Sequence, residues 1–213
     1  MIRPSEFKQE AEMPELNALI VVDPQVDFCP GGALAVTDGD RIMPYINAMM
    51  PSFDKVFITQ DWHPEDHSSF ASQHDDAAAY STIDMVYGSQ TLWPDHCIVG
   101  SAGADFHPNL NSDFAAAIIR KGMNPMIDSY SAFFENDKIT TTGLGDLLHA
   151  HNVVSVTLVG LATDFCVAWS ALDAVKLGFN VSIDLKACRA IDLDGSLDKA
   201  LSDMRGAGVL LHS

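Results

Sequence analysis

Three stretches of this chain are almost continuously apolar, and each ends at or near a polar residue or a glycine. They read NALIVVD at residues 17–23, VVSVTLVG at 153–160 and GVLLH at 208–212. A strand with one solvent-exposed face alternates apolar and polar side chains, whereas a parallel strand covered on both faces does not. Weaker strand-like runs occur at 55–61, 115–121 and 180–185. We therefore predict a mostly parallel sheet of about six strands with both faces covered.

Helical patterns lie between these runs, at residues 41–50, 143–150, 163–177 and 196–204. The pattern at 163–177 is the clearest, since Thr163 or Asp164 can cap its start and Gly178 can end it in the left-handed conformation. Alternating strands and helices are typical of an α/β protein. We predict a three-layer αβα sandwich that forms one domain over residues 17–213, after an N-terminal extension at residues 1–16.

The composition excludes several classes of partner. The chain has 213 residues, a net charge of −17 and a pI near 4.5, which argues against binding to nucleic acid or to anionic membranes. The four cysteines form no CxxC pair, and such sparse cysteines are typical of a reducing compartment. We find no signal-peptide pattern and no apolar run long enough to span a membrane. We predict a cytoplasmic protein and leave its oligomeric state open, a homo-oligomer included.

Four chemically useful side chains fall at or just after the ends of predicted strands. Asp23, Asp61 and Lys121 end the first three strands along the chain, and Cys166 follows the fourth after a short turn. Each alone has an ordinary explanation, such as a turn-capping aspartate or a solvated lysine. Ligands of open parallel sheets bind beyond the carboxyl ends of the strands, where all four would meet. Their coincidence predicts a catalytic site.

Cys166 fits either of two roles. A buried free cysteine is most often a small apolar residue that fills a core. At a helix N-terminus beside a lysine, however, the pKa of a thiol is expected to fall, which favours the nucleophilic thiolate. The N–H groups of the preceding turn, GLATDFC, are free to bind an oxyanion because the first turn of a helix leaves them unpaired. With Asp23 and Lys121 nearby, the nucleophile is the stronger interpretation.

The segments DWHPEDH and WPDHC suggest a metal site within a long irregular stretch at 63–97. Asp61 and His63 are two residues apart, so an extended backbone points both side chains to one side. His67 and His96 would complete a set of one carboxylate and three imidazoles. Such ligands suit one divalent ion, with zinc first and iron or manganese as alternatives. The ordinary alternative is a group of loop histidines with unrelated hydrogen bonds.

The motifs match a known family. The chain resembles the nicotinamidases (pyrazinamidases) of the isochorismatase-like cysteine hydrolase superfamily. The resemblance extends from about Ala18 to Asp184 and rests on ALIVVDPQVDFCPGGALAV, TQDWHPEDHSSF, LWPDHCIVGSAGADFHPNL, RKG and VGLATDFCVAWSALDAVKLGFNV. Residues 122–139 align least securely. The resemblance implies the isochorismatase-like hydrolase fold.

The resemblance also implies roles for individual residues. It implies a catalytic triad, a set of metal ligands and two aromatic walls for a pyridine ring, which here are Asp23, Lys121 and Cys166; Asp61, His63, His67 and His96; and Phe28 and Trp93. The family has a cis peptide bond before its oxyanion-hole alanine, here Leu161–Ala162, with Leu161 also beside the substrate.

The implied reaction is the hydrolysis of nicotinamide to nicotinic acid and ammonia through a thioester, with pyrazinamide as a further substrate. Two alternatives stay open at this point. One is a relative that hydrolyses another amide or ureido compound or isochorismate, against which the full metal-ligand set speaks. The other is a non-catalytic ligand-binding relative, against which the intact Asp23, Lys121 and Cys166 speak.

Overall fold

A six-stranded parallel sheet forms the centre of the computed structural model, which describes residues 14–213. The strands lie in the order β5-β2-β1-β6-β7-β8, and every neighbouring pair is parallel. Their bounds are β1 Leu16–Val22, β2 Lys55–Asp61, β5 Ala117–Lys121, β6 Val153–Leu161, β7 Asn180–Arg189 and β8 Leu210–His212. The predicted sheet is confirmed. The predicted N-terminal extension falls mostly on residues 1–13, outside the described residues.

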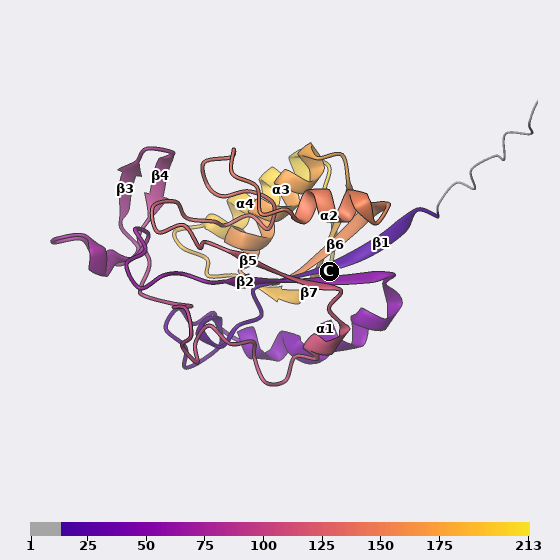
Figure 1. Ribbon diagram of the computed structural model, residues 1–213, viewed down its shortest axis with the longest axis horizontal. Helices are drawn as coiled ribbons and strands as arrows, with labels where there is room; N and C mark the ends of the chain where they lie inside the picture. The colour runs from indigo at the N-terminus through magenta and orange to yellow at the C-terminus, as the bar shows by residue number, and fades with distance from the viewer. Residues whose placement is uncertain (1–13) are drawn as a thin grey trace, which may run out of the picture.

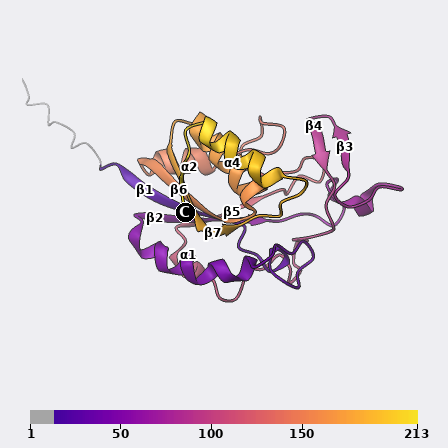
Figure 2. The same cartoon turned by 180° about the vertical axis from the view of Figure 1, so that it is seen from behind.

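Four helices cover the two faces of this sheet, as Figures 1 and 2 show from opposite sides. One face carries α1 (Met43–Met49), and the other carries α2 (Leu144–Ala150), α3 (Ala168–Lys176) and α4 (Ser196–Gly206). The three-layer sandwich is therefore confirmed. None of the helices at residues 14–213 is long and apolar enough to cross a bilayer.

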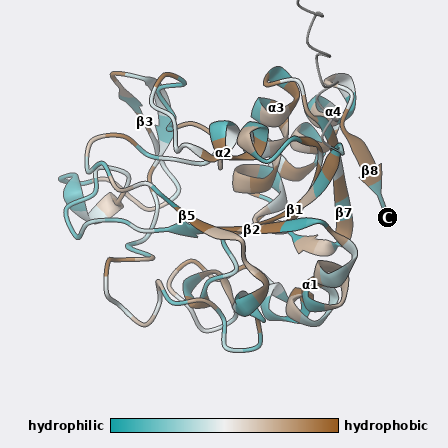
Figure 3. Ribbon diagram, turned by 45° about the vertical axis from the view of Figure 1, so that its right-hand side comes forward, coloured by the Kyte–Doolittle hydropathy of each residue, from teal (hydrophilic) through white to brown (hydrophobic). Residues whose placement is uncertain are grey.

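The core lies along the central strands, because their side chains are covered from both sides. Residues Ala18 to Val22 of β1 have no exposed surface, and β6 is similarly buried over its last four residues. Figure 3 shows apolar residues concentrated on the strands between the two helical layers. This double covering is the physical reason for the apolar runs of β1 and β6. The same prediction was wrong for β8, which lies at the edge of the sheet with Leu210 exposed.

Two segments differ from the prediction. The irregular stretch contains a small antiparallel hairpin, β3 (Thr82–Met85) and β4 (Gly88–Thr91), which projects from one end of the molecule in Figure 1. The expected helix at 163–177 begins as a π-helical turn at Thr163–Val167 before α3. Neither Thr163 nor Asp164 caps it, so that prediction was wrong. Asp164 instead accepts hydrogen bonds from the N–H groups of Ile191 and Asp192.

Gly160 lets β1 and β6 approach each other closely near the carboxyl ends of the two strands. Its φ is +118°, and a Cβ built there would lie 2.1 Å from the carbonyl oxygen of Val22. Only glycine combines this conformation with this space. The close approach brings Asp23, which follows Val22, next to the turn that leads to Cys166. Gly178, with φ +91°, ends the helical segment as predicted.

Candidate active site

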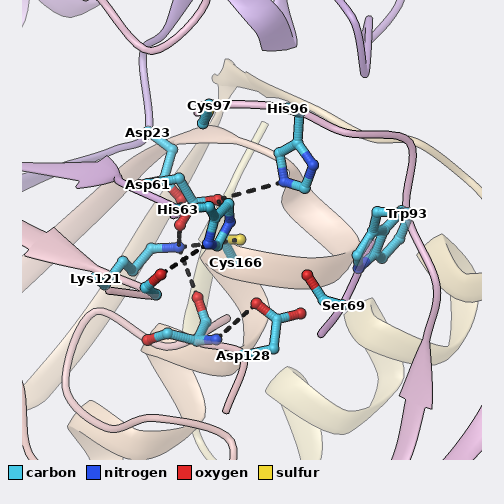
Figure 4. A network of polar contacts seen from close by, with 12 residues as sticks. Asp23, Asp61, His63, Ser69, Trp93, His96, Cys97, Lys121, Asp128 and Cys166 are labelled. Carbon is cyan, nitrogen blue, oxygen red and sulfur yellow. Dashed lines mark hydrogen bonds and ion pairs between the residues drawn. The ribbon is translucent and has the colours of Figure 1, made fainter. Parts of the chain in front are cut away.

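A buried lysine lies at the centre of the polar cluster beyond the strand ends. Figure 4 shows Lys121, the last residue of β5, directed toward Asp23, Asp61 and Cys166. Its Nζ lies 2.9 Å from Oδ2 of Asp23 and 3.7 Å from Sγ of Cys166, and it also forms an ion pair with Asp61. It donates a further hydrogen bond of 2.7 Å to the carbonyl of Ser129. The strand-end residues therefore meet as the sequence pattern predicted.

The charges in this cluster are buried and stabilise one another. Burial alone would lower the pKa of Lys121, but Asp23 and Asp61 hold it well above its usual value. Burial raises the pKa of Asp23 to about 6, and the charge of Lys121 only partly opposes this. For Asp61 burial acts in the same upward direction, but Lys121 and His63 hold its pKa well below its usual range. Of these two carboxylates, Asp23 therefore has the pKa closer to neutral pH.

Cys166 lies at the inner end of a cavity and is 8% exposed. Burial raises the pKa of its thiol well above the usual value, and Lys121 opposes that rise only in part. The predicted lowering of this pKa was wrong, because desolvation of the thiolate outweighs the charge beside it. Sγ of Cys166 and a carboxylate oxygen of Asp23 lie within 4.8 Å of each other, and Nζ of Lys121 contacts both side chains.

The turn before Cys166 contains the expected cis peptide bond, between Leu161 and Ala162. Ala162 lines the cavity together with Cys166. Leu161 is fully buried, and its side chain lies near Gly39 rather than among the residues described as lining the cavity. The predicted place of Leu161 beside the substrate stays a prediction.

Three buried histidines are anchored by one ring nitrogen each. Nδ1 of His63 lies 2.9 Å from the carbonyl of Gly122, and Nδ1 of His96 lies 2.8 Å from that of Pro94. Nδ1 of His67 lies 2.7 Å from the Ser69 hydroxyl. The Nε2 atoms of His63 and His67 are buried without a hydrogen-bond partner. Anchoring through one nitrogen, with the other left unpaired, is how proteins orient metal-binding imidazoles.

The four predicted metal ligands do not converge equally. Ligand atoms of Asp61, His63 and His96 all lie within 4.8 Å of one another. His67 instead groups with His63 and Asp128 by the same measure. Burial lowers the pKa of His67 and of His96 to about 4, which keeps both rings in the neutral form that binds metal. The donor set fits a divalent ion of the zinc type.

Aromatic side chains form much of the cavity wall. Phe28 lies against His96 with ring centroids 5.5 Å apart, and Trp93 packs edge-on against Phe165 at 4.9 Å. The cavity is lined by Phe28, Leu34, Asp61, Trp93, His96, Asp128, Tyr130, Ala162, Phe165, Cys166 and Ile191. One pocket therefore contains several aromatic side chains, Cys166 and two of the candidate metal ligands, Asp61 and His96.

Sequence reasoning missed several residues of this pocket. Asp128 and Tyr130 come from the segment after Lys121, where no periodicity marks structure and the family resemblance aligns least securely. Ile191 comes from the loop after β7, which Asp164 holds in place. Phe165 is next to Cys166, so its place in the motif was the one available signal.

The amino-acid sequence of the chain is similar to those of known proteins. Residues 17–213 match the family described as Isochorismatase domain. The nicotinamidase of Acinetobacter baylyi is 50% identical over 202 residues, which cover 94% of this chain and 94% of that protein. The nicotinamidase of Escherichia coli is 41% identical, covering 92% of this chain and 94% of that protein.

Solved structures agree with the sequence comparison. The Acinetobacter baumanii nicotinamidase/pyrazinamidase superposes with a TM-score of 0.92 at 51% identity, covering 95% of this chain and 98% of that one. L. infantum PnC1, in complex with nicotinate, has a TM-score of 0.81 at 39% identity, covering 92% and 91%. The pyrazinamidase of Pyrococcus horikoshii, in complex with zinc, has a TM-score of 0.75 at 36% identity, covering 93% and 98%.

Proposed function

Because this chain belongs to the isochorismatase family, we propose that it is a nicotinamidase, which hydrolyses nicotinamide to nicotinic acid and ammonia. The observation that carries the proposal is that Cys166, Asp61 and His96 line one cavity, while the buried Asp23 lies beside Cys166 and His63 lies beside the other two ligands. The relatives named nicotinamidase at 50% and 41% identity support the same reaction. Pyrazinamide, which carries the same carboxamide on a similar ring, is a further substrate.

Asp61, His63 and His96 would hold the metal ion, with His67 next to them. Zinc is the ion we propose, on the donor set and on the zinc complex of the Pyrococcus horikoshii relative. When bound, the ion supplies a Lewis-acid contact for the pyridine nitrogen, which orients the ring. Asp61 and His96 line the same cavity as Cys166, so a ring held by the ion would have its carboxamide within reach of the sulfur.

Phe28 and Trp93 hold the faces of the ring. Both are buried to at least nine-tenths, and both line the cavity. A flat slot between two aromatic side chains favours a planar heteroaromatic ring and excludes bulky aliphatic amides. The walls thereby select the class of substrate, while Cys166 and its neighbours act on the amide group.

Asp23 acts as the general base for Cys166. It accepts the thiol proton as the sulfur attacks the amide carbon, and Lys121 stabilises the negative charge on whichever of the two carries it. The N–H groups of Ala162 and Cys166 bind the developing oxyanion. Since burial raises the thiol pKa, the thiolate forms only in concert with this attack rather than in the resting protein.

Asp23 then returns the proton to the leaving nitrogen, which departs as ammonia and leaves a thioester on Cys166. A water molecule attacks the thioester carbon, and Asp23 accepts a proton from that water. The tetrahedral oxyanion collapses at the same N–H groups, the carbon–sulfur bond breaks, and the thiol regains its proton. Nicotinic acid leaves the cavity, and Asp23 is again ionised.

The molecule's charge and thiols are consistent with a small-molecule enzyme of the cytoplasm. Its net charge of −17 disfavours nucleic acid and anionic membranes as partners. Its four cysteines are all free and buried, which suits a reducing compartment. These properties support the proposed localisation and a small-molecule substrate.

The test is ammonia release from nicotinamide, pyrazinamide and a ureido compound by the purified protein, with and without a chelator. We expect release from the first two, loss after chelation and recovery on adding zinc. Release only from the ureido compound would assign the chain to another branch of the family. No release from any of the three by the zinc-loaded protein would favour a ligand-binding relative.

A further inference from the structure

Gln90 is a fully buried amide on an otherwise exposed element. The β3–β4 hairpin projects from the end of the molecule in Figure 1, and Gln90 is the one fully buried residue of its eight strand positions. Its neighbour Ser89 points to the opposite side and is exposed. A buried amide is costly unless all its polar groups are paired. The partners of Gln90 therefore explain why it is buried.

The amide nitrogen of Gln90 reaches residues of the substrate cavity. Nε2 lies 2.7 Å from Oδ2 of Asp128 and 3.0 Å from the hydroxyl of Tyr130, and it also contacts the carbonyl of Thr91 at 2.7 Å. Asp128 and Tyr130 both line the cavity. Gln90 itself is absent from the cavity lining described for residues 14–213, so it stands behind the wall.

The orientation of this amide follows from a chain of hydrogen bonds. The backbone N–H of Tyr130 donates to Oδ1 of Asn136 at 3.0 Å, which directs Nδ2 of Asn136 toward Gln90. Oε1 of Gln90 accepts from that Nδ2 at 3.1 Å and from the hydroxyl of Tyr87 at 3.2 Å. A flipped amide would set donor against donor here and oxygen against the Asp128 carboxylate. This orientation therefore sets donors against acceptors throughout, with the two N–H groups of the amide shared among three acceptors.

The same hydrogen bonds reach the aromatic wall. The indole Nε1 of Trp93 donates to the Tyr130 hydroxyl at 3.0 Å, the atom that also accepts from Gln90. Figure 4 shows Trp93 and Asp128 on the same side of the cluster, across from Lys121. Trp93, Tyr130 and Asp128 are thus joined, directly or through one hydroxyl, to a single side chain of the hairpin.

We propose that Gln90 is a positioning residue that fixes the Trp93–Tyr130–Asp128 wall of the cavity and so sets the affinity for the pyridine ring. This inference rests on the proposed function, in which Trp93 holds that ring. Gln90 touches neither the reacting atoms nor the ring itself. Its loss removes one of the two groups that hold the Tyr130 hydroxyl and one donor to the Asp128 carboxylate. The wall then samples other orientations, and substrate binding weakens.

The test compares Gln90→Met, which keeps length and volume, with Ser89→Ala on the exposed side of the same strand. For zinc-loaded Gln90→Met we expect KM for nicotinamide and Kd for nicotinate to rise about tenfold, with kcat changed less than about threefold. The indole N–H resonance of Trp93 should move, while that of Trp62, which packs against Arg120, stays in place. Ser89→Ala should change none of these.

Unchanged KM and Kd in Gln90→Met would overturn the inference, and so would a rise in either without movement of the Trp93 resonance. Tyr87→Phe provides a second variant if Gln90→Met does not fold, since it removes one hydroxyl, which donates to Oε1 of Gln90 and accepts a longer hydrogen bond from the N–H of Asp128. It should move the Trp93 resonance less; no movement at all would contradict the proposal. The resonance and the nicotinate Kd need no turnover, so they remain informative if the proposed reaction itself fails.

Discussion

Nζ of Lys121 lies 2.9 Å from Oδ2 of Asp23, and both side chains are completely buried. Neither charge is solvated, so each depends on the other and on Asp61 for its stability. The pair stands behind Cys166, where it can receive the thiol proton and neutralise the charge that results. The same contact therefore serves the fold and the proposed chemistry.

Replacement of Lys121 should lower both the stability of the fold and the activity. In Lys121→Met, Asp23 and Asp61 lose their shared cation, and we expect the free energy of unfolding to fall by about 3–5 kcal/mol. We expect kcat/KM to fall by at least about 100-fold. Urea unfolding at pH 7 and a nicotinamide assay measure the two effects. Lys176→Met removes an exposed partner of Asp173 and should cost under about 1 kcal/mol. Equal effects of the two variants would contradict this account.

The acid limb of the pH profile should report Asp23. The base must be ionised to accept the thiol proton, and burial raises the pKa of Asp23 to about 6. As the pH falls through that value Asp23 becomes protonated, so kcat/KM should decline about tenfold per pH unit below about pH 6. Initial rates with nicotinamide between about pH 4.5 and 8 measure this decline. A flat profile of kcat/KM down to about pH 4.5 would exclude Asp23 as the base.

Metal content should depend more on His63 than on His67. His63 belongs to both of the candidate ligand groups that contain histidine, whereas His67 is grouped away from Asp61 and His96. We expect His63→Ala to lose most of its zinc and to raise KM, and His67→Ala to retain more zinc. Elemental analysis of dialysed protein gives the stoichiometry. Wild-type zinc content in His63→Ala would reject the proposed site.

Gly160 should be irreplaceable at the junction of β1 and β6. A Cβ there would lie 2.1 Å from the Val22 carbonyl oxygen, with φ already at +118°. We expect Gly160→Ala to lower the free energy of unfolding by at least about 2 kcal/mol. Gly206→Ala, at the end of α4 with nothing nearby, should instead raise it by a few tenths to about 1 kcal/mol. Thermal unfolding of both variants provides the comparison; a Gly160→Ala protein as stable as wild type would disprove the close approach.

The sequence allowed the centre of the sheet to be predicted because β1 and β6 are covered on both faces and carry little polar alternation. Asp23, Asp61, Lys121 and Cys166 were predictable for a related reason, since each falls at or just after a strand end that must lie at one edge. The β3–β4 hairpin was not, because short exposed strands bury too little apolar surface to leave a pattern. Tyr130 and Asp128 also escaped prediction, since an irregular loop places them.

Electrostatics was the least predictable property. Helix N-terminus and lysine both argued for a lowered thiol pKa at Cys166, yet burial outweighs them. Asp164 looked like a helix cap, but it holds the loop of Ile191 through hydrogen bonds across 27 positions of sequence. Both outcomes depend on how deeply a side chain lies, which local sequence does not report.

The central claim is that Cys166 is the nucleophile of a nicotinamide hydrolase. Its most direct test is ammonia release from nicotinamide, measured side by side for zinc-loaded wild type and Cys166→Ala. The account predicts equal amounts of ammonia and nicotinic acid from wild type, none above background from Cys166→Ala, and the same zinc content in both. Sustained turnover by Cys166→Ala would contradict it.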